Sequence, residues 1–426
     1  MRRDFLKYCA LAGLGLTVPA RNQSDVRAED RDRPYEGPFY VAFGAQGGWD
    51  TTYLMDPRGT AASNRLYHQD DIQTHGAHRY APTKKIKTEG LSNEEFFTEF
   101  GSELLVLNGL DYSVNNHAPG SRYMATGKLD SMEYPTFAAL AAACRGPNCP
   151  LAYLTFDGYA ATGNLIPRSS VPYPHSLQKM AYADGIEGNA KAPYHDQFVL
   201  DRIDQAMAEQ EAARAKQPRL PRTAHAQNML YAAQSSSQAL RRVGEFIPSK
   251  IPNERLKKHS EIALASFKAG VCVSANFTLL GFDSHANNDR DQMKLIPTLL
   301  DGIAHFLRRA EELKIRERIV MVIHSEMGRT PGYNKQDGKD HWSIGSVMFL
   351  GQGIRGNRVV GATDENQLTI PINPATLACD KEHGIRVRPE HLHHALRELA
   401  GIAEHPLAKK FPLGVATGER LASLWG

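Results

Sequence analysis

The feature that most constrains the fold is an apolar run followed by a long amphipathic stretch and then a second apolar run. Residues 271–280 read as a buried strand, and apolar residues recur at helical spacing between 290 and 314. The second apolar run covers residues 318–324. A strand, a helix and a strand in this order are typical of parallel strands joined by a crossover helix. The sequence therefore predicts an α/β fold whose mostly parallel sheet is flanked by helices.

The rest of the chain adds elements of the same kinds. Further strands are predicted at 38–44, 103–108 and 344–350, and helices at 253–269 and from His117 onward. Residues 130–195 are rich in proline and turn residues, and two polar helical stretches follow at 199–217 and 222–246. We expect an α/β domain at 38–426 that carries a helical insertion at about 130–250. The role of the arm at 199–246 stays open.

The first 20 residues are typical of an export signal. The pair Arg2-Arg3 precedes a short apolar run, and small residues surround Ala20. The apolar run is shorter than the roughly 20 residues that span a bilayer. We therefore predict a twin-arginine signal peptide at 1–20, a linker at 21–37, and a periplasmic or extracellular protein without a membrane span.

The net charge limits the kinds of partner that we expect, and the cysteines limit the kinds of disulfide and metal site. Without residues 1–20 the chain has 47 basic and 46 acidic residues, a balance that predicts neither a nucleic-acid partner nor an anionic membrane surface. Cys144 and Cys149 are spaced for a small loop disulfide in an oxidising compartment, and Cys272 lies in an apolar run as a core residue. The chain has no CxxC motif, which argues against a thiolate zinc site.

Side chains suited to metal binding stand where the predicted strands end and where one helix begins. Because the carboxyl ends of parallel strands share one edge of a sheet, we expect these residues to face a common rim. Such oxygen and nitrogen donors suit one or two divalent ions, with zinc or manganese favoured and magnesium compatible. The competing interpretation is that each residue caps a turn or a helix. The candidate metal ligands are Asp50, Asp283, His285, Glu326 and His341, with His117 on the same rim.

Two of the rim residues have candidate catalytic roles. Arg329 follows Glu326 by three residues, and a guanidinium there is suited to bidentate binding of an oxyanion. His117 is a candidate nucleophile, and the alternative nucleophile is a metal-bound water.

Five sequence motifs in this order resemble one known family. They are the twin-arginine start, Gly47-Gly48-Trp49-Asp50, Gly281-Phe282-Asp283-Ser284-His285, Ser325-Glu326-Met327-Gly328-Arg329-Thr330 and Gly338-Lys339-Asp340-His341-Trp342. The family is the exported bacterial family called domain of unknown function 1501, itself similar to the alkaline phosphatase and sulfatase superfamily. The resemblance extends over roughly residues 38–365.

The superfamily resemblance implies a parallel-sheet core with two adjacent metal sites at the carboxyl ends of its strands. By position, Asp50 resembles the first-strand ligand, Asp283 and His285 the middle pair, and His341 the late histidine. The chain departs from the pattern at two places. Glu326-Met327 stands where the superfamily has an Asp-His pair, and His117 stands near the place of its serine, threonine or cysteine nucleophile.

Three functions remain compatible with these residues, because a fold does not determine an activity. The first is a metal-dependent hydrolase of phosphate or sulfate esters, with a small molecule or a glycan as the alcohol part. The second is a non-catalytic, metal-stabilised binding or scaffold protein of the cell envelope. The third is a metal-free structural protein. The sequence identifies neither the substrate nor a protein partner.

Overall fold

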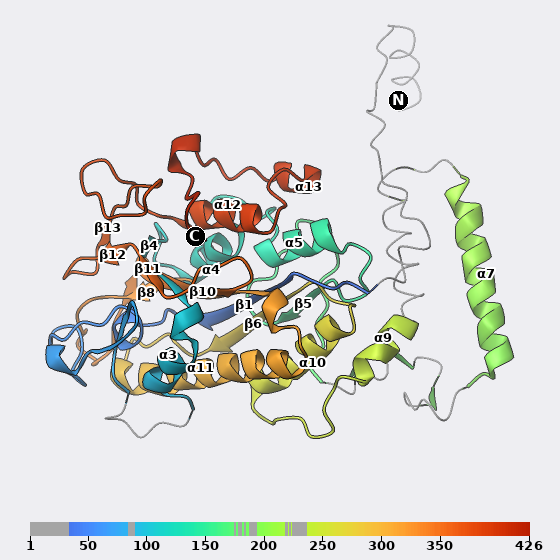
Figure 1. Cartoon of the computed structure of the whole chain (residues 1–426), viewed down its shortest axis with the longest axis horizontal. Coiled ribbons are helices and arrows are strands. Elements are labelled where there is room, and N and C mark those ends of the chain that lie inside the picture. Colours follow the sequence, from blue (N-terminus) through green and yellow to red (C-terminus); the bar gives the residue numbers. More distant parts are fainter. Residues whose placement is uncertain are drawn as a thin grey trace, which may run out of the picture. The chain divides into compact units, whose positions relative to one another are not determined.

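The centre of the computed structural model is a seven-stranded sheet whose order, within the part of the chain that the structure describes, is β11-β4-β10-β7-β1-β6-β5 (Figure 1). In that order the strands are β11 (Arg358–Val360), β4 (Leu105–Asp111), β10 (Ile344–Gly351), β7 (Ile319–Ser325), β1 (Phe39–Gln46), β6 (Ser274–Leu280) and β5 (Tyr153–Phe156). Strands β5, β6, β1 and β7 are parallel neighbours. Strand β10 runs antiparallel to β7 and β4, and β11 is parallel to β4. The predicted α/β class with a mostly parallel sheet is therefore confirmed.

The structure describes residues 34–83, 90–173, 194–217 and 237–426, with shorter pieces at 176–177, 181–182, 185–186, 220 and 223. The predicted signal peptide and most of the predicted linker lie outside these residues, as does most of the helical stretch predicted at 222–246. Among the described residues, no helix has both the length and the apolar character that crossing a membrane requires.

Helices cover both faces of the sheet, as predicted (Figure 1). Helices α3 (Asn93–Phe100), α10 (Arg255–Lys268) and α11 (Asn288–Glu312) share a core with one face. Helices α4 (His117–Thr126), α5 (Phe137–Arg145) and α12 (Pro389–Leu399) pack on the other. Because side chains alternate along a strand, β1 contributes to both cores. Phe39 stacks on Phe267 of α10 at 4.7 Å, whereas Tyr40 meets Phe137 of α5 edge-on at 5.5 Å.

Helix α11 shows why the longest predicted helix forms. Its apolar residues recur at helical spacing and are buried. Asp289 and Asp291 lie in its first turn, where their negative charges interact favourably with the positive end of the helix dipole. Burying a leucine such as Leu299 or Leu300 stabilises the fold by about 1.5–3 kcal/mol. The helix covers the sheet and places its N-terminus beside the loop that follows β6.

The other named elements of the described residues lie outside the main sheet and the six helices above. The helices are α7 (Gln197–Ala215), α9 (Ser237–Gly244) and α13 (Pro406–Lys409), and the 3₁₀ turns are Thr51–Tyr53, Gln69–Asp71, Gly101–Glu103, Arg316–Arg318 and Thr417–Glu419. The two-stranded pairs are β2 (Gln73–His75) with β3 (His78–Tyr80), β8 (Gly328–Arg329) with β9 (His341–Trp342), and β12 (Ala362–Thr363) with β13 (Thr369–Ile370).

Two predictions about residues 130–250 differ from the structure. Strand β5 pairs with β6 in the main sheet and α5 packs against that sheet, so the first part of this range belongs to the core. The predicted disulfide is not formed, since Cys144 and Cys149 are free thiols. Their sulfurs have different neighbours: Cys144 Sγ lies 3.3 Å from His405 Nδ1, and Cys149 Sγ lies 3.9 Å from the Gly270 carbonyl oxygen.

Candidate metal centre

The site lies at the carboxyl ends of three neighbouring parallel strands. The loops after β1, β6 and β7 carry Asp50, Asp283 and Glu326 respectively, and α4 begins at His117 on the same rim. Strands β6 and β7 flank β1 in register, so their ends meet at one edge of the sheet. The fold therefore brings the predicted rim residues into one region.

The Gly47-Gly48 turn allows these loops to touch. Gly47 has a φ of +121°, and a Cβ built on it would lie 2.3 Å from the main-chain nitrogen of Asp283. Only glycine tolerates that conformation and that approach. The Gly47 amide also donates a hydrogen bond of 2.8 Å to Glu326 Oε1. The close approach that glycine permits here is to the protein's own backbone, and it fixes where Asp283 lies.

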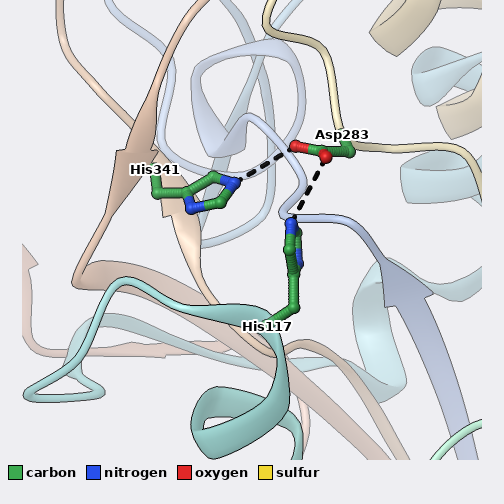
Figure 2. A group of neighbouring side chains, drawn as sticks. All are labelled: His117, Asp283 and His341. Carbon is green, nitrogen blue, oxygen red and sulfur yellow. Dashed lines mark hydrogen bonds and ion pairs between the residues drawn. The ribbon is translucent and has the colours of Figure 1, made fainter.

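Three histidines surround Asp283. Figure 2 shows His117 and His341 pointing toward its carboxylate from α4 and β9. His117 Nε2 lies 3.3 Å from Oδ2, and His341 Nε2 lies 3.2 Å from Oδ1. His285 Nε2 lies 3.2 Å from Oδ1 and 3.0 Å from His341 Nε2. One carboxylate therefore contacts all three imidazoles.

The other nitrogen of each imidazole is bound to a group that only accepts hydrogen bonds. His117 Nδ1 lies 2.9 Å from Glu326 Oε1, and His285 Nδ1 lies 2.9 Å from Asp340 Oδ1. His341 Nδ1 lies 2.8 Å from the main-chain oxygen of Asn115. Since a carboxylate and a carbonyl cannot donate, each Nδ1 carries the proton. The three Nε2 atoms then present lone pairs toward Asp283.

A divalent cation satisfies this arrangement. Three imidazole lone pairs and a carboxylate converge, and His117 Nε2 is buried without a hydrogen-bond partner. Ligand atoms of His117, Asp283 and His341 all lie within 4.8 Å of one another, close enough to share one metal ion. His285 Nε2 lies 3.0 Å from His341 Nε2 and 3.2 Å from Asp283 Oδ1, beside that group. Acceptors on the far nitrogens are also typical of metal-binding histidines. The residues present therefore fit a metal ion, and they fit one ion.

The cluster is accessible to solvent on one side. The side chains of Asp283 and His285 are 46% and 45% exposed, and those of His117 and His341 are 35% and 21% exposed. The side chains of the cluster are therefore partly exposed to solvent, although His117 Nε2 itself is buried.

Arg329 holds Asp283 from behind. Its Nη2 donates to Asp283 Oδ1 at 2.6 Å and to the Gly47 carbonyl, while Nε and Nη1 donate to the carbonyls of Gly48 and Lys339 at 3.0 Å each. Partial burial acts to raise the pKa of Asp283, but the Arg329 guanidinium, together with His341 and His117, lowers that pKa to about 2. The arginine side chain is fully buried, and its donors face the protein. We therefore reassign Arg329 from oxyanion binding to the positioning of Asp283.

Glu326 also has a different role from the one predicted. It is 4% exposed, and its Oε1 accepts from the Gly47 amide and from His117 Nδ1. The hydrogen bond to Glu326 raises the pKa of His117. Glu326 therefore contacts Nδ1 of His117, while the other ring nitrogen of His117, a candidate nucleophile in the sequence, faces Asp283.

Replacing Glu326 by leucine should weaken metal binding by about 10–100-fold, the usual effect of losing the partner of a ligating histidine. Glu326→Gln keeps an acceptor for His117 Nδ1 and should lower the metal affinity much less. Affinity is measured by competition with a chromophoric chelator. Glu261→Leu is the control, because Glu261 is equally buried and contacts a histidine, His305, outside the cluster. Equal metal affinity in the leucine variants at 326 and 261 would contradict the role assigned to Glu326.

Asp50 lies apart from the histidine cluster, in contrast to the sequence prediction. Its Oδ2 lies 2.7 Å from Lys339 Nζ and accepts from Asn288 Nδ2 at 2.9 Å. Its Oδ1 accepts from the amide and hydroxyl of Thr52. Both side chains of the Asp50–Lys339 pair are fully buried. An ammonium group thus occupies the position next to Asp50 where the resemblance implied a metal ion.

Lys339 and Asp340 belong to the motif at 338–342, but the sequence predicted no role for either residue. Asp340 directly precedes His341 in the sequence, but its carboxylate lies 2.9 Å from Nδ1 of His285, so adjacency in sequence does not indicate its partner. Nothing in the sequence marks the main-chain oxygen of Asn115 as the acceptor for His341.

Comparisons with known proteins agree with the resemblance. The family model DUF1501, described as a protein of unknown function, matches residues 181–401. No curated protein matches the chain. Similar solved structures include the sulfatase PsFucS1 from Pseudoalteromonas sp., at 9% identity and a TM-score of 0.38, covering 92% of this chain and 72% of that one. The alkaline phosphatase from the Antarctic bacterium TAB5 matches at 9% identity and a TM-score of 0.36, covering 87% and 99%. Likeness of this size transfers no activity to this chain.

Proposed function

The chain belongs to the DUF1501 family, and from the geometry of its site we propose that it binds one divalent metal ion and hydrolyses phosphate or sulfate esters. The observation that carries the proposal is the convergence of three imidazole lone pairs on Asp283, each imidazole oriented from behind by an acceptor. The same cluster is exposed to solvent, as a site for a substrate must be.

The donor set favours zinc over manganese, because imidazole nitrogens with one carboxylate are typical of zinc sites, whereas manganese prefers oxygen ligands. His117, His285, His341 and Asp283 would hold the ion. A bound divalent ion supplies Lewis acidity toward an ester oxygen and lowers the pKa of water.

The chain's own residues prepare the site for an anionic ester. Arg329 keeps Asp283 ionised, and Glu326 and Asp340 hold two imidazoles in one tautomer. Helix α4 begins at His117, so the positive end of its dipole lies at the cluster and favours a negatively charged group. The alcohol part of the ester, small molecule or glycan, stays unassigned.

One observation favours the second function, a metal-stabilised envelope protein without turnover. His285 Nε2 lies next to His341 and Asp283, and with His285 as a fourth donor a tetrahedral zinc ion would be filled. Closed sites of this kind are structural, whereas catalytic sites keep an open position. Export by the twin-arginine pathway to the periplasm or beyond is part of both proposals and rests on the sequence of residues 1–20.

Hydrolysis of an ester distinguishes the hydrolase from the non-catalytic envelope protein. Protein loaded with one equivalent of zinc is assayed with 4-nitrophenyl phosphate and 4-nitrophenyl sulfate, and then with glycan sulfates. The hydrolase proposal predicts activity that a chelator removes, that zinc restores and that His341→Ala lacks. One bound equivalent that raises the melting temperature, without turnover of any ester, would favour the scaffold and overturn the hydrolase.

A further inference from the structure

A groove that solvent reaches runs between the sheet and helices α4, α5 and α12. Ala42 lies in the middle of β1, an interior strand of the sheet, and yet it is only partly buried. Ala125 of α4 and Phe137 of α5 are also partly exposed, and all three residues line the groove. The helices therefore leave part of this face of the sheet uncovered, with a space of about 80 Å³ above it.

One end of the groove adjoins the metal centre. Glu326 lines the groove, and its Oε1 lies 2.9 Å from His117 Nδ1. Ser121 lines it from α4, about one helical turn after His117. Gln46, the last residue of β1, lines it directly before the Gly47-Gly48 turn. The groove therefore starts at the carboxyl ends of the strands, where the cluster lies, and continues along α4 toward α5.

The walls of the groove favour an apolar occupant. Ala42, Ala125 and Phe137 supply accessible apolar surface, and neither lysine nor arginine is among the described lining residues. Asn276 also lines the groove, but its Nδ2 already donates to the Tyr153 hydroxyl at 2.7 Å. A sugar ring placed here would exchange the hydrogen bonds that its hydroxyls make with water for few others. An aryl or alkyl group loses no hydrogen bonds and gains by leaving water.

We propose that this groove holds the alcohol part of the ester, and that this part is a small aryl or alkyl group in place of a sugar. The inference rests on the proposed function, because it assumes that the anionic group of the ester lies at the metal cluster. The groove and the cluster share Glu326 and α4, so one molecule is able to occupy both. A space of about 80 Å³ takes about five to eight water-sized groups at about 10–15 Å³ each, which is the size of one benzene ring.

Phosphonates and sulfonates test this without turnover, because their P–C and S–C bonds are not those that an esterase hydrolyses. Isothermal titration calorimetry compares phenylphosphonate with methylphosphonate, and benzenesulfonate with methanesulfonate, on the zinc-loaded full chain. In at least one pair the phenyl compound should bind at least tenfold more tightly, because its ring leaves water for the groove. The sugar sulfonate 6-deoxy-6-sulfoglucose should bind no more tightly than methanesulfonate.

Two leucine variants locate the effect. Ala42→Leu should remove the preference for the phenyl compound, because the larger side chain occupies the groove, and should leave the affinity for the methyl compound unchanged. Ala125→Leu narrows the groove from α4 and should act in the same way, which keeps the test valid if the Ala42 variant does not fold. Ala206→Leu is the matched control, since Ala206 is a solvent-exposed alanine of α7.

The outcomes separate this inference from the proposed function. Equal affinity within both pairs, no binding of any phenyl compound, or tighter binding of the sugar sulfonate than of benzenesulfonate would overturn the inference. So would a phenyl preference that persists in both leucine variants. Hydrolysis of 4-nitrophenyl esters without a phenyl preference would overturn this inference alone, whereas a phenyl preference without hydrolysis of any ester would overturn the hydrolase.

Discussion

Replacing Asp283 by alanine should abolish the binding of the one equivalent of zinc expected in the wild-type chain. Asp283 contacts all three histidines, through Oδ1 to His285 and His341 and through Oδ2 to His117. Its removal takes away a ligand and the negative charge that offsets the cation. We expect a loss of more than about 100-fold in affinity, beyond the effect of a second-sphere change.

Elemental analysis of protein purified without chelators and without a histidine tag measures this result. Asp130→Ala is the matched control, since Asp130 is a solvent-exposed aspartate paired with Lys128. Cys272→Ala changes a buried residue that directly precedes β6 and lies outside the cluster. This variant should also keep the metal. Equal zinc content in the Asp283 and Asp130 variants would refute the ligand assignment.

A third variant separates metal loss from unfolding. Asp283 is also the carboxylate partner of the buried Arg329, so its truncation to alanine leaves a guanidinium less well neutralised. Asp283→Asn keeps an oxygen within reach of Arg329 Nη2 but lacks the charge. Loss of zinc from a folded Asn variant would assign the effect to the metal site.

The fold was predictable because hydrophobic periodicity is a local property. The apolar run 318–324 became β7, and the helical pattern at 290–314 became α11. Strand β5 was not predicted, since only four residues form it within a proline-rich region. Its place in the sheet depends on pairing with β6, which no local pattern encodes.

The sequence indicates where the candidate site lies more clearly than it indicates the role of each residue in it. His117, Asp283, His285 and His341 are marked by their place at strand ends and at a helix start. Which partner each side chain takes depends on contacts between distant residues, such as Glu326 with His117 across 209 positions. Arg329 shows the same limit: an arginine after a strand end suggests anion binding, but the Gly47-Gly48 turn supplies its acceptors.

Replacing Lys339 by methionine should lower the free energy of unfolding by about 3–5 kcal/mol, the effect of removing one partner of a buried ion pair. Methionine retains most of the apolar stem of lysine, so the change is chiefly in charge and hydrogen bonding. Lys339 Nζ donates to the Ser63 carbonyl at 2.5 Å and lies 5.2 Å from the ring centre of Tyr333. Its loss leaves the Asp50 carboxylate buried without a cation.

Urea unfolding measures this difference, and two comparisons test its cause. Lys257→Met disrupts an ion pair with Asp301 in which both side chains are about a quarter exposed, and it should change the free energy of unfolding by only about 0–1 kcal/mol. Adding Asp50→Asn to Lys339→Met removes the unpaired charge and should restore part of the loss. The zinc content of Lys339→Met should equal that of the wild type, because Asp50 contributes no ligand. A fall in zinc content together with unchanged stability would return Asp50 to the metal site.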